Sequence, residues 1–122
     1  MGDEEILMEK AVRKLEAART LCEHGFYGDA VSRAYYAMFF AARALLSRRN
    51  IYPKTHRGLI SQFGLKFVKN GGFHKEIFDI LLRAYEDREE ADYGILSEID
   101  QKEAIIIIKG AWKFVEECKT FR

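Results

Sequence analysis

Two arginines stand inside the most apolar stretch of the chain, and the first of them, Arg33, is the strongest candidate for chemistry. Arg33 lies near the start of Ser32–Leu46, most of whose residues are Ala, Leu, Phe and Tyr. A guanidinium in such a helix is costly unless a carboxylate, a phosphate or an interface satisfies it. Tyr36 and Phe40, three and seven positions further on, share its helical face. We therefore expect this face to meet a carboxylate, a phosphate or a protein surface.

Tyrosine and histidine side chains offer two further kinds of chemistry. Tyr35 and Tyr36 could stack on bases or nucleotide rings, although packing in the core or an interface is the role we expect at this spacing. His56, which follows Pro53 at the start of another helix, could act as a general acid or base if it reaches the Arg33 face. A local structural role, such as a hydrogen bond to a nearby carbonyl, is the one we expect for it.

Charged residues of a later helix suggest pairing rather than catalysis. Arg88 and Asp92 are four residues apart, which is the spacing of ion pairs on one helix. Alternatively, Asp92 or Glu89 satisfies Arg33, which would explain a buried arginine without any ligand. The three histidines are scattered, and no helical His/Glu pair has the spacing of metal ligands, so we expect no metal and no other cofactor.

Five helices must position these residues. A composition of 48% hydrophobic and 32% charged residues with a single Pro is typical of a helical globular protein. Apolar residues recur at helical spacing, and short connections between long helices predict antiparallel neighbours. The predicted fold class is therefore all-α, an antiparallel bundle of four to five helices that forms one domain over residues 1–122. The predicted helices are Asp3–His24, Tyr27 or Asp29 to Arg49, Thr55–Asn70, Phe73–Tyr93 and Gln101–Thr120.

Capping residues mark several of these boundaries. Thr55 is a candidate N-cap, and Asp100 and Glu103 form a capping-box pair before a run of four Ile. Isoleucine favours strands, but the cap in front of the run predicts a helix. Gly25 and Gly94 are predicted to stop the helices that precede them.

Positive charge is concentrated in the middle of the chain. The net charge is only +1, but Ala30–Lys75 holds nine Lys or Arg and no Asp or Glu, while the flanks hold 11 basic and 19 acidic residues. Such a basic segment could form a phosphate-facing surface. It could instead be neutralised by the acidic flanking helices, or bind an acidic protein.

Three segments carry a resemblance to a known family. Ser32–Leu46, Lys54–Ile60 with Phe63 and Gly64, and Arg88–Tyr93 together resemble HEPN domains, in particular a small stand-alone prokaryotic group. The resemblance covers about the whole chain. It implies a bundle of four to five helices that usually dimerises, so that two copies of the central helix face each other.

The resemblance also implies a chemistry. Many HEPN proteins are metal-independent RNases or toxins, often paired with a small nucleotidyltransferase-like antitoxin. Their signature is an Arg and a His with four to six residues between them. The Arg holds a phosphate. The His acts as a general acid or base when a ribose 2′-OH attacks that phosphate. Arg33 matches the Arg, but position 40, where relatives carry the His, is Phe40, which cannot transfer a proton.

These observations lead to one hypothesis and two alternatives. The hypothesis is a dimeric HEPN module that associates with RNA or a nucleotide and does not cleave it. The alternatives are an active metal-independent RNase that uses another base, or a structural or accessory subunit that docks to a nucleotidyltransferase. Whether the chain is an enzyme stays open. The candidate residues are Arg33 and His56 for catalysis, Arg33, Tyr36, Arg43, Arg57 and Tyr93 for binding, Phe40 and Tyr35 for an interface, and Arg88 with Asp92 for pairing.

The sequence also predicts the compartment. Acidic residues occupy the place of the positively charged start of a secretory signal. The longest uninterrupted apolar run, Ala104–Ile108, is far too short to span a bilayer. We therefore expect a cytoplasmic protein without a membrane partner.

Overall fold

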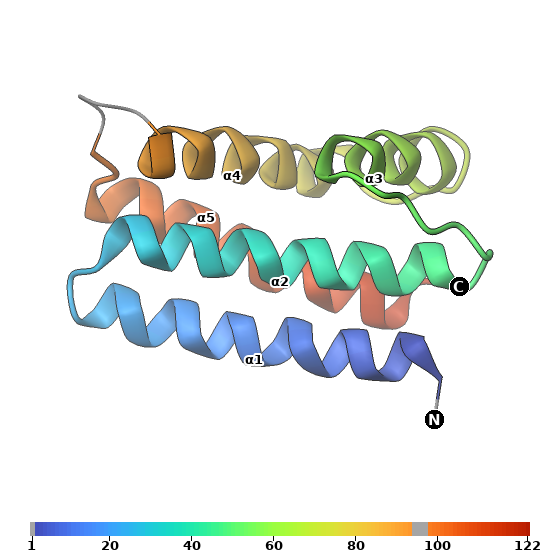
Figure 1. Cartoon of the computed structure of the whole chain (residues 1–122), viewed down its shortest axis with the longest axis horizontal. Helices are drawn as coiled ribbons and strands as arrows, with labels where there is room; N and C mark the ends of the chain where they lie inside the picture. Colours follow the sequence, from blue (N-terminus) through green and yellow to red (C-terminus); the bar gives the residue numbers. More distant parts are fainter. Residues whose placement is uncertain (1, 94–97) are drawn as a thin grey trace.

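Helices make up most of the computed structural model, which describes residues 2–93 and 98–122 without the side chains of residues 90–93. No strand occurs within these ranges, which confirms the predicted all-α class. The helices lie side by side in a bundle with short connections (Figure 1). They are α1 (Asp3–Glu23), α2 (Tyr27–Ser47), α3 (His56–Phe63) with its π-helical continuation η1 (Gly64–Lys69), α4 (Lys75–Tyr93) and α5 (Gln101–Thr120).

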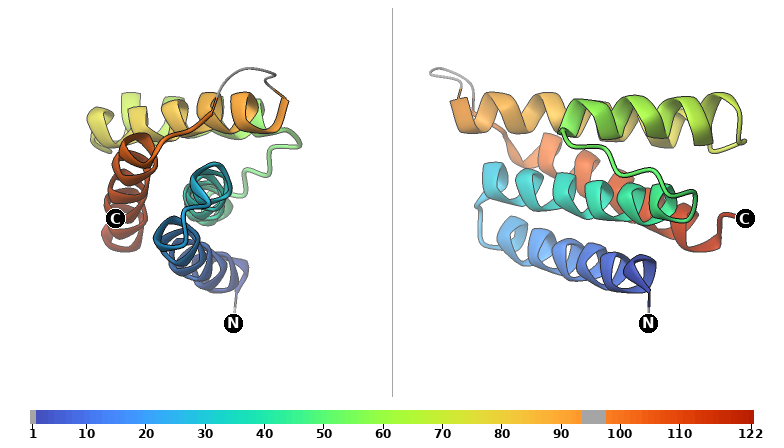
Figure 2. Two further views of the ribbon diagram at one scale, coloured as in Figure 1. Left: turned by 90° about the vertical axis from the view of Figure 1, so that its left-hand side faces the viewer. Right: turned by 45° about the vertical axis from the view of Figure 1, so that its right-hand side comes forward.

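The central helix is α2, which contacts α1, α3, α4 and α5. Figures 1 and 2 show α1 on one side of α2, with α3 and α4 on the opposite side and α5 running alongside. Only a narrow stripe of α2 is left uncovered, because its small Ala side chains allow neighbouring helices to approach closely. Its fully buried residues are Ala30, Val31, Ala34, Tyr35, Ala37, Met38, Ala41, Ala42, Ala44, Leu45 and Leu46.

Most of the predicted helix ends are confirmed. Thr55 Oγ1 accepts the backbone N–H of Gly58 at 2.9 Å, and Asp100 Oδ1 accepts that of Glu103 at 2.8 Å. Gly25 ends the first helix with a φ of 84°, in the left-handed region that glycine favours. The predicted stop at Gly94 lies outside the described residues.

The third predicted helix changes its winding part-way. Instead of one α-helix over Thr55–Asn70, α3 gives way at Gly64 to the π-helical segment η1. A side chain at Gly64 would stand 3.0 Å from the Phe78 ring, so the missing Cβ lets α4 approach this junction. The fourth helix was predicted to begin at Phe73, but α4 begins two residues later, at Lys75. Phe73 instead packs its buried ring 5.0 Å from that of Phe63.

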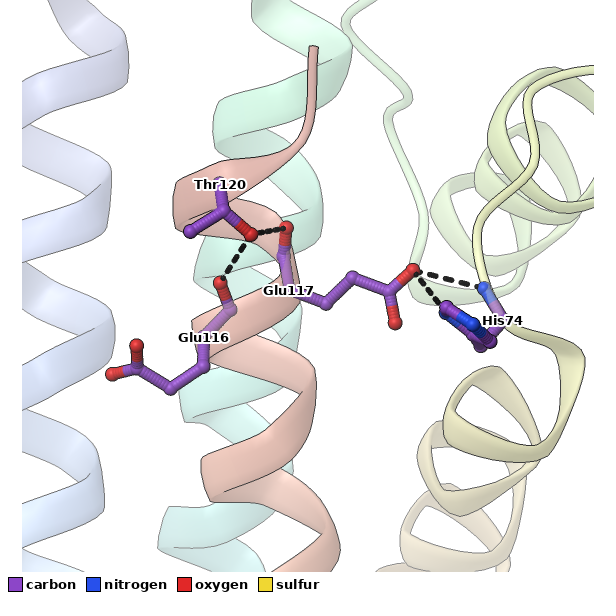
Figure 3. A network of polar contacts seen from close by, with 4 residues as sticks. All are labelled: His74, Glu116, Glu117 and Thr120. Atoms are coloured by element: carbon purple, nitrogen blue, oxygen red, sulfur yellow. Dashed lines mark hydrogen bonds and ion pairs between the residues drawn. The ribbon is translucent and has the colours of Figure 1, made fainter.

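A carboxylate of α5 holds the start of α4. Glu117 Oε2 accepts hydrogen bonds from the backbone N–H of His74 at 2.9 Å and from its Nδ1 at 3.0 Å (Figure 3). This bond raises the pKa of His74. Within α5, the Thr120 hydroxyl donates to the carbonyl oxygens of Glu116 and Glu117. His74 directly precedes α4, so Glu117 supplies the cap for that helix.

A second polar contact joins the first turn of α5 to the middle of α4. Glu103, whose side chain the sequence assigned to the capping box, instead accepts two hydrogen bonds from Arg83 of α4, the Nε–Oε2 distance being 2.8 Å. Asp87 lies beside this pair. Burial and a hydrogen bond to the Glu103 carboxylate raise the pKa of Asp87 from 3.8 to about 7.

The close approach of α4 and α5 generates a stability prediction. A Cβ at buried Gly110 would lie 2.5 Å from Cγ2 of Ile80, so Gly110→Ala must displace Ile80 although Ala favours a helix. We expect a loss of about 1–3 kcal/mol in the free energy of unfolding, measured by urea denaturation. Lys109→Ala at the exposed neighbouring position should change it by less than about 0.5 kcal/mol. Equal values for the two variants would contradict the tight contact.

The carboxyl pair generates a pH prediction. Folded Asp87 keeps its proton up to about pH 7, whereas an unfolded aspartate releases it near pH 4. Because the folded state binds more protons in this window, the contribution of Asp87 to stability falls as the pH rises through it. Asp87→Asn should therefore flatten the change in Tm between about pH 5 and pH 8. Asp79→Asn, which breaks a surface pair with Lys75 on the same helix, should keep the wild-type dependence.

Candidate functional site

Arg33 projects from the uncovered stripe of α2 and is exposed. It has no hydrogen bond or ion pair with any residue that the structure describes. The alternative that Glu89 satisfies a buried Arg33 is therefore wrong, because Arg33 is exposed and Glu89 contacts Arg88. The other carboxylate of that alternative, Asp92, has its side chain outside the described ones. The stripe is open at Arg33 because α1 and α4 cover the other faces of α2. The residue lines a surface hollow of about 380 Å³ together with Lys14, Asp29, Ser32, Tyr36 and Phe40.

Phe40 lies between this hollow and a second one. Its ring is 6.3 Å from the ring of Tyr36, which is on the Arg33 side. On the other side, the Lys10 ammonium lies 5.6 Å from the Phe40 ring centroid. The sequence correctly placed Arg33, Tyr36 and Phe40 on one helical face. The second hollow, of about 250 Å³, is lined by Asp3, Ile6, Leu7, Lys10, Phe40, Arg43 and Tyr52.

His56 belongs to a different cluster, centred on Tyr35. Its Nδ1 lies 2.7 Å from the Tyr35 hydroxyl, and its ring stacks on that of Phe39 at 4.5 Å. The structural role predicted for His56 is thus present, but its partner is a buried tyrosine of α2 rather than a nearby carbonyl. Tyr36 separates His56 from the hollow, with its ring 5.9 Å from the imidazole. The structure does not bring His56 and Arg33 into contact.

The protonation of this pair follows from burial. Tyr35 is fully buried, which raises its pKa, so its hydroxyl keeps its proton. Since His56 is its one hydrogen-bond partner among the described residues, the hydroxyl donates to Nδ1. Burial, and then the charge of Arg88, lower the pKa of His56. At neutral pH the imidazole is therefore uncharged and carries its proton on Nε2.

Arg88 of α4 covers the two tyrosines. Its Nη2 donates to the Tyr36 hydroxyl at 2.8 Å, and its guanidinium lies 5.0 Å from the Tyr36 ring and 5.6 Å from the Tyr35 ring. Nη1 contacts Glu89 Oε1 at 3.3 Å. Sequence reasoning missed this role, because 52 residues separate Arg88 from Tyr36 and helical spacing reports only on neighbours. The predicted pairing with Asp92 falls on a side chain outside the described ones.

The remaining binding candidates are distributed unevenly. Arg43 lines the second hollow, beside the Arg33 face. Arg57 is exposed on α3 but lines neither hollow. The side chain of Tyr93 lies outside the described ones. The structure therefore groups Arg33, Tyr36, Phe40 and Arg43 along one stripe of α2 and leaves Arg57 apart from it.

The acidic flanks neutralise only part of the basic segment. Arg48 forms an ion pair with Glu4 of α1 at 2.7 Å and donates to the carbonyl oxygen of Phe121 at 2.8 Å. Arg49 lies 4.3 Å from the Phe67 ring centroid and donates to the Lys66 carbonyl. These cations at the end of α2 thus have intramolecular partners, whereas those of the stripe face solvent.

Among the residues that the structure describes, no group of three or more His, Cys, Asp and Glu side chains could hold a metal ion. None of the helices within those ranges is both long enough and apolar enough to cross a membrane.

Comparison with known proteins identifies the family. The model of the HEPN domain matches residues 4–121. The chain belongs to the HEPN family. Among its relatives, a protein from Methanocaldococcus jannaschii that is provisionally named a toxin is 45% identical over 114 residues, which are 93% of this chain and 84% of the relative.

Two further relatives extend the comparison. A second provisionally named toxin from M. jannaschii is 38% identical over 117 residues, 96% of this HEPN domain and 80% of that protein. A UPF0332 protein from Archaeoglobus fulgidus is also 38% identical, over 119 residues that cover 98% of this chain and 94% of the relative. The similarity therefore spans the whole bundle, including every element that contributes to the two hollows.

The charges around His56 generate a prediction for this HEPN domain. Arg88→Met removes a positive charge that opposes protonation, so the pKa of His56 should rise. Glu89→Gln removes a negative charge and should lower it further. Titration of the His56 ring by NMR measures both shifts. Arg88→Lys keeps the charge and is the control, and shifts of the same sign in Arg88→Met and Glu89→Gln would contradict this assignment.

Proposed function

We propose that this HEPN domain is a module of a toxin–antitoxin or defence system that binds RNA or a nucleotide at the Arg33 hollow and does not cleave it. The observation that carries the proposal is the position of Arg33. Its guanidinium is exposed, has no partner among the described residues, and lines a hollow with Lys14 and Tyr36. A free guanidinium beside a second cation suits bidentate contact with a phosphate.

The absence of cleavage follows from Phe40. Metal-independent attack by a ribose 2′-OH needs a group that accepts and returns a proton near the phosphate. HEPN proteins that the sequence resembles carry His at this place. Here the lining residues of the hollow include Phe40 but no His. The proposal is therefore a module that holds its ligand with the phosphate-binding half of the family signature.

The proposal also includes partners. The toxin names of two relatives support a toxin–antitoxin setting, and the resemblance makes a nucleotidyltransferase-like antitoxin the class of partner to look for. A homodimer through the uncovered stripe of α2 belongs to the same proposal, since an aromatic side chain such as Phe40 is well suited to an interface. We place the complex in the cytoplasm.

One observation favours a second candidate function, an active RNase that uses His56. The imidazole is uncharged at neutral pH, with the cation Arg88 close enough to lower its pKa. Because Nδ1 accepts from Tyr35 and Nε2 carries the proton, His56 could act as a base only after its hydrogen bond to Tyr35 is broken. Tyr36 contacts both the His56 cluster and the Arg33 hollow. A shift of Tyr36 would be needed before His56 could reach a phosphate held by Arg33.

The test is incubation of the purified chain with mixed RNA in excess chelator, followed by both cleavage and gel retardation. We expect wild type to bind RNA without cleaving it. Arg33→Ala should weaken binding about tenfold or more, because a charge-assisted contact is lost. Arg19→Ala, which removes an exposed arginine of α1 outside both hollows, is the matched control. Phe40→His should gain cleavage.

The other outcomes separate the candidates. Cleavage by wild type that is lost in Arg33→Ala would contradict the non-catalytic function, and loss in His56→Ala as well would support the second candidate. If wild type neither binds nor cleaves RNA, the RNA-binding function is wrong. The scaffold and the antitoxin-docking roles would then be the ones to pursue.

A further inference from the structure

Another hollow, of about 580 Å³, lies between α1 and the last turn of α5. Two apolar side chains of α1, Met8 and Val12, line it and are half-buried. Exposed carboxylates accompany them, at Glu5, Glu9 and Glu16. We call this surface the acidic groove. It combines an apolar base, which can take up another apolar side chain, with a rim that attracts cations.

Negative charge is in excess in the acidic groove. Of its two cations, Lys119 is already paired with Glu116 of the same helix at 3.6 Å. Arg13 is the other, and it faces the three glutamates without an ion pair to any described residue. The groove shares no lining residue with the two hollows of the Arg33 face, which Lys10 and Lys14 line on the other edge of α1. It is therefore a separate surface of opposite charge.

A complementary surface lies on α3 and η1. Arg57, Ser61, Leu65 and Lys69 follow one another at intervals of four, so they share one face, and all four are exposed. Leu65 is 43% exposed, a large apolar side chain between two cations. Neither cation has a polar contact with a described residue, and α3 and η1 contain no Asp or Glu. We call this surface the basic ridge.

The ridge matches the groove in chemistry and in length. The ridge places one apolar side chain between two cations, and the groove places an apolar base between carboxylates. The 11 positions from Glu5 to Glu16 span roughly 16 Å at about 1.5 Å per residue. Arg57 and Lys69 are 12 positions apart along α3 and η1, which is a comparable length. With the cations beside the carboxylates, Leu65 would lie over the apolar base.

The two surfaces cannot meet within one chain. Figure 2 shows α1 on one side of α2 and α3 on the opposite side. A ridge can therefore fill only the groove of another molecule, and this chain itself supplies a ridge of the required charge and spacing. Such a contact joins two different surfaces, so it is head-to-tail and repeats from copy to copy.

We propose that the basic ridge of one copy docks in the acidic groove of a second copy, with Leu65 packed on Met8 and Val12 and the flanking cations beside the glutamates. This contact does not rest on the proposed RNA-binding function. It leaves the uncovered stripe of α2 free, so it adds a second kind of association to a homodimer through that stripe.

Two charge reversals separate the two halves of the contact. Glu9→Lys changes the groove and keeps the ridge, whereas Lys69→Glu does the converse. We expect light scattering of wild type to show masses above that of a dimer as concentration rises, more so at low salt. Each variant should self-associate about tenfold more weakly or less. Glu23→Lys, on α1 outside the groove, is the control and should behave like wild type.

A mixture of the two variants tests the head-to-tail geometry. The Glu9→Lys chain supplies an intact ridge and the Lys69→Glu chain an intact groove, so an equimolar mixture should associate although neither variant does so alone. With isotope label on the methionine methyl groups of the Lys69→Glu chain, NMR should show a shift of Met8 and none of Met38, which is fully buried. Adding Leu65→Asp to the unlabelled chain should abolish the shift, and circular dichroism verifies that it is folded.

Other results would overturn the proposal. If wild type does not exceed the mass of a dimer and Met8 does not shift in the mixture, the docking of a second copy is wrong. Self-association that survives both charge reversals but is lost in Phe40→Leu would assign it to the stripe of α2 alone. If a synthetic amphipathic Lys/Leu helix shifts Met8 while the Glu9→Lys chain does not, the groove belongs to a basic helix of a different protein.

Discussion

The rest of the structure depends on the burial of α2 among four neighbours. Eleven of its residues are fully buried, and five of these lie in the segment from Ala30 to Ala37. Burial of this kind removes apolar area from water and gives the bundle its core. It also leaves a single stripe of α2 open to solvent, and every side chain that can meet a ligand on this helix has to lie on that stripe. The position of the proposed binding surface is thus a consequence of how the core is packed.

Two chemically different faces of α2 result from this arrangement. Toward α3 and α4, buried Tyr35 and half-buried His56 form a hydrogen-bonded pair with Arg88 close by. Toward solvent, Arg33 and Phe40 line the hollows together with cations of α1. Tyr36 belongs to both, because its ring contacts Phe40 and its hydroxyl accepts from Arg88. Coupling between the two faces would therefore pass through this one side chain, whose orientation Arg88 holds.

Membership of the HEPN family and the geometry of the stripe limit what the chain can do. The Arg33 guanidinium is exposed and has no partner among the described residues, and Phe40 on the same face cannot transfer a proton. These two side chains support the proposed role of binding a ligand without transforming it. The basic end of α2 offers less free positive charge to a ligand than its composition suggests. Arg48 forms an ion pair with Glu4, and the Arg49 guanidinium lies over the Phe67 ring.

The sequence by itself determined the helices, their main caps and the face shared by Arg33, Tyr36 and Phe40, since helical periodicity and capping depend on residues within one or two turns. It did not determine that Arg33 is exposed, that Glu103 binds Arg83 or that His56 meets Tyr35. The two contacts join residues 20 or more positions apart, and the exposure of Arg33 depends on which faces of α2 its neighbours cover. Only the packing of the helices could therefore decide all three. The sequence also did not predict the π-helical segment that begins at Gly64, where the Phe78 ring of α4 approaches.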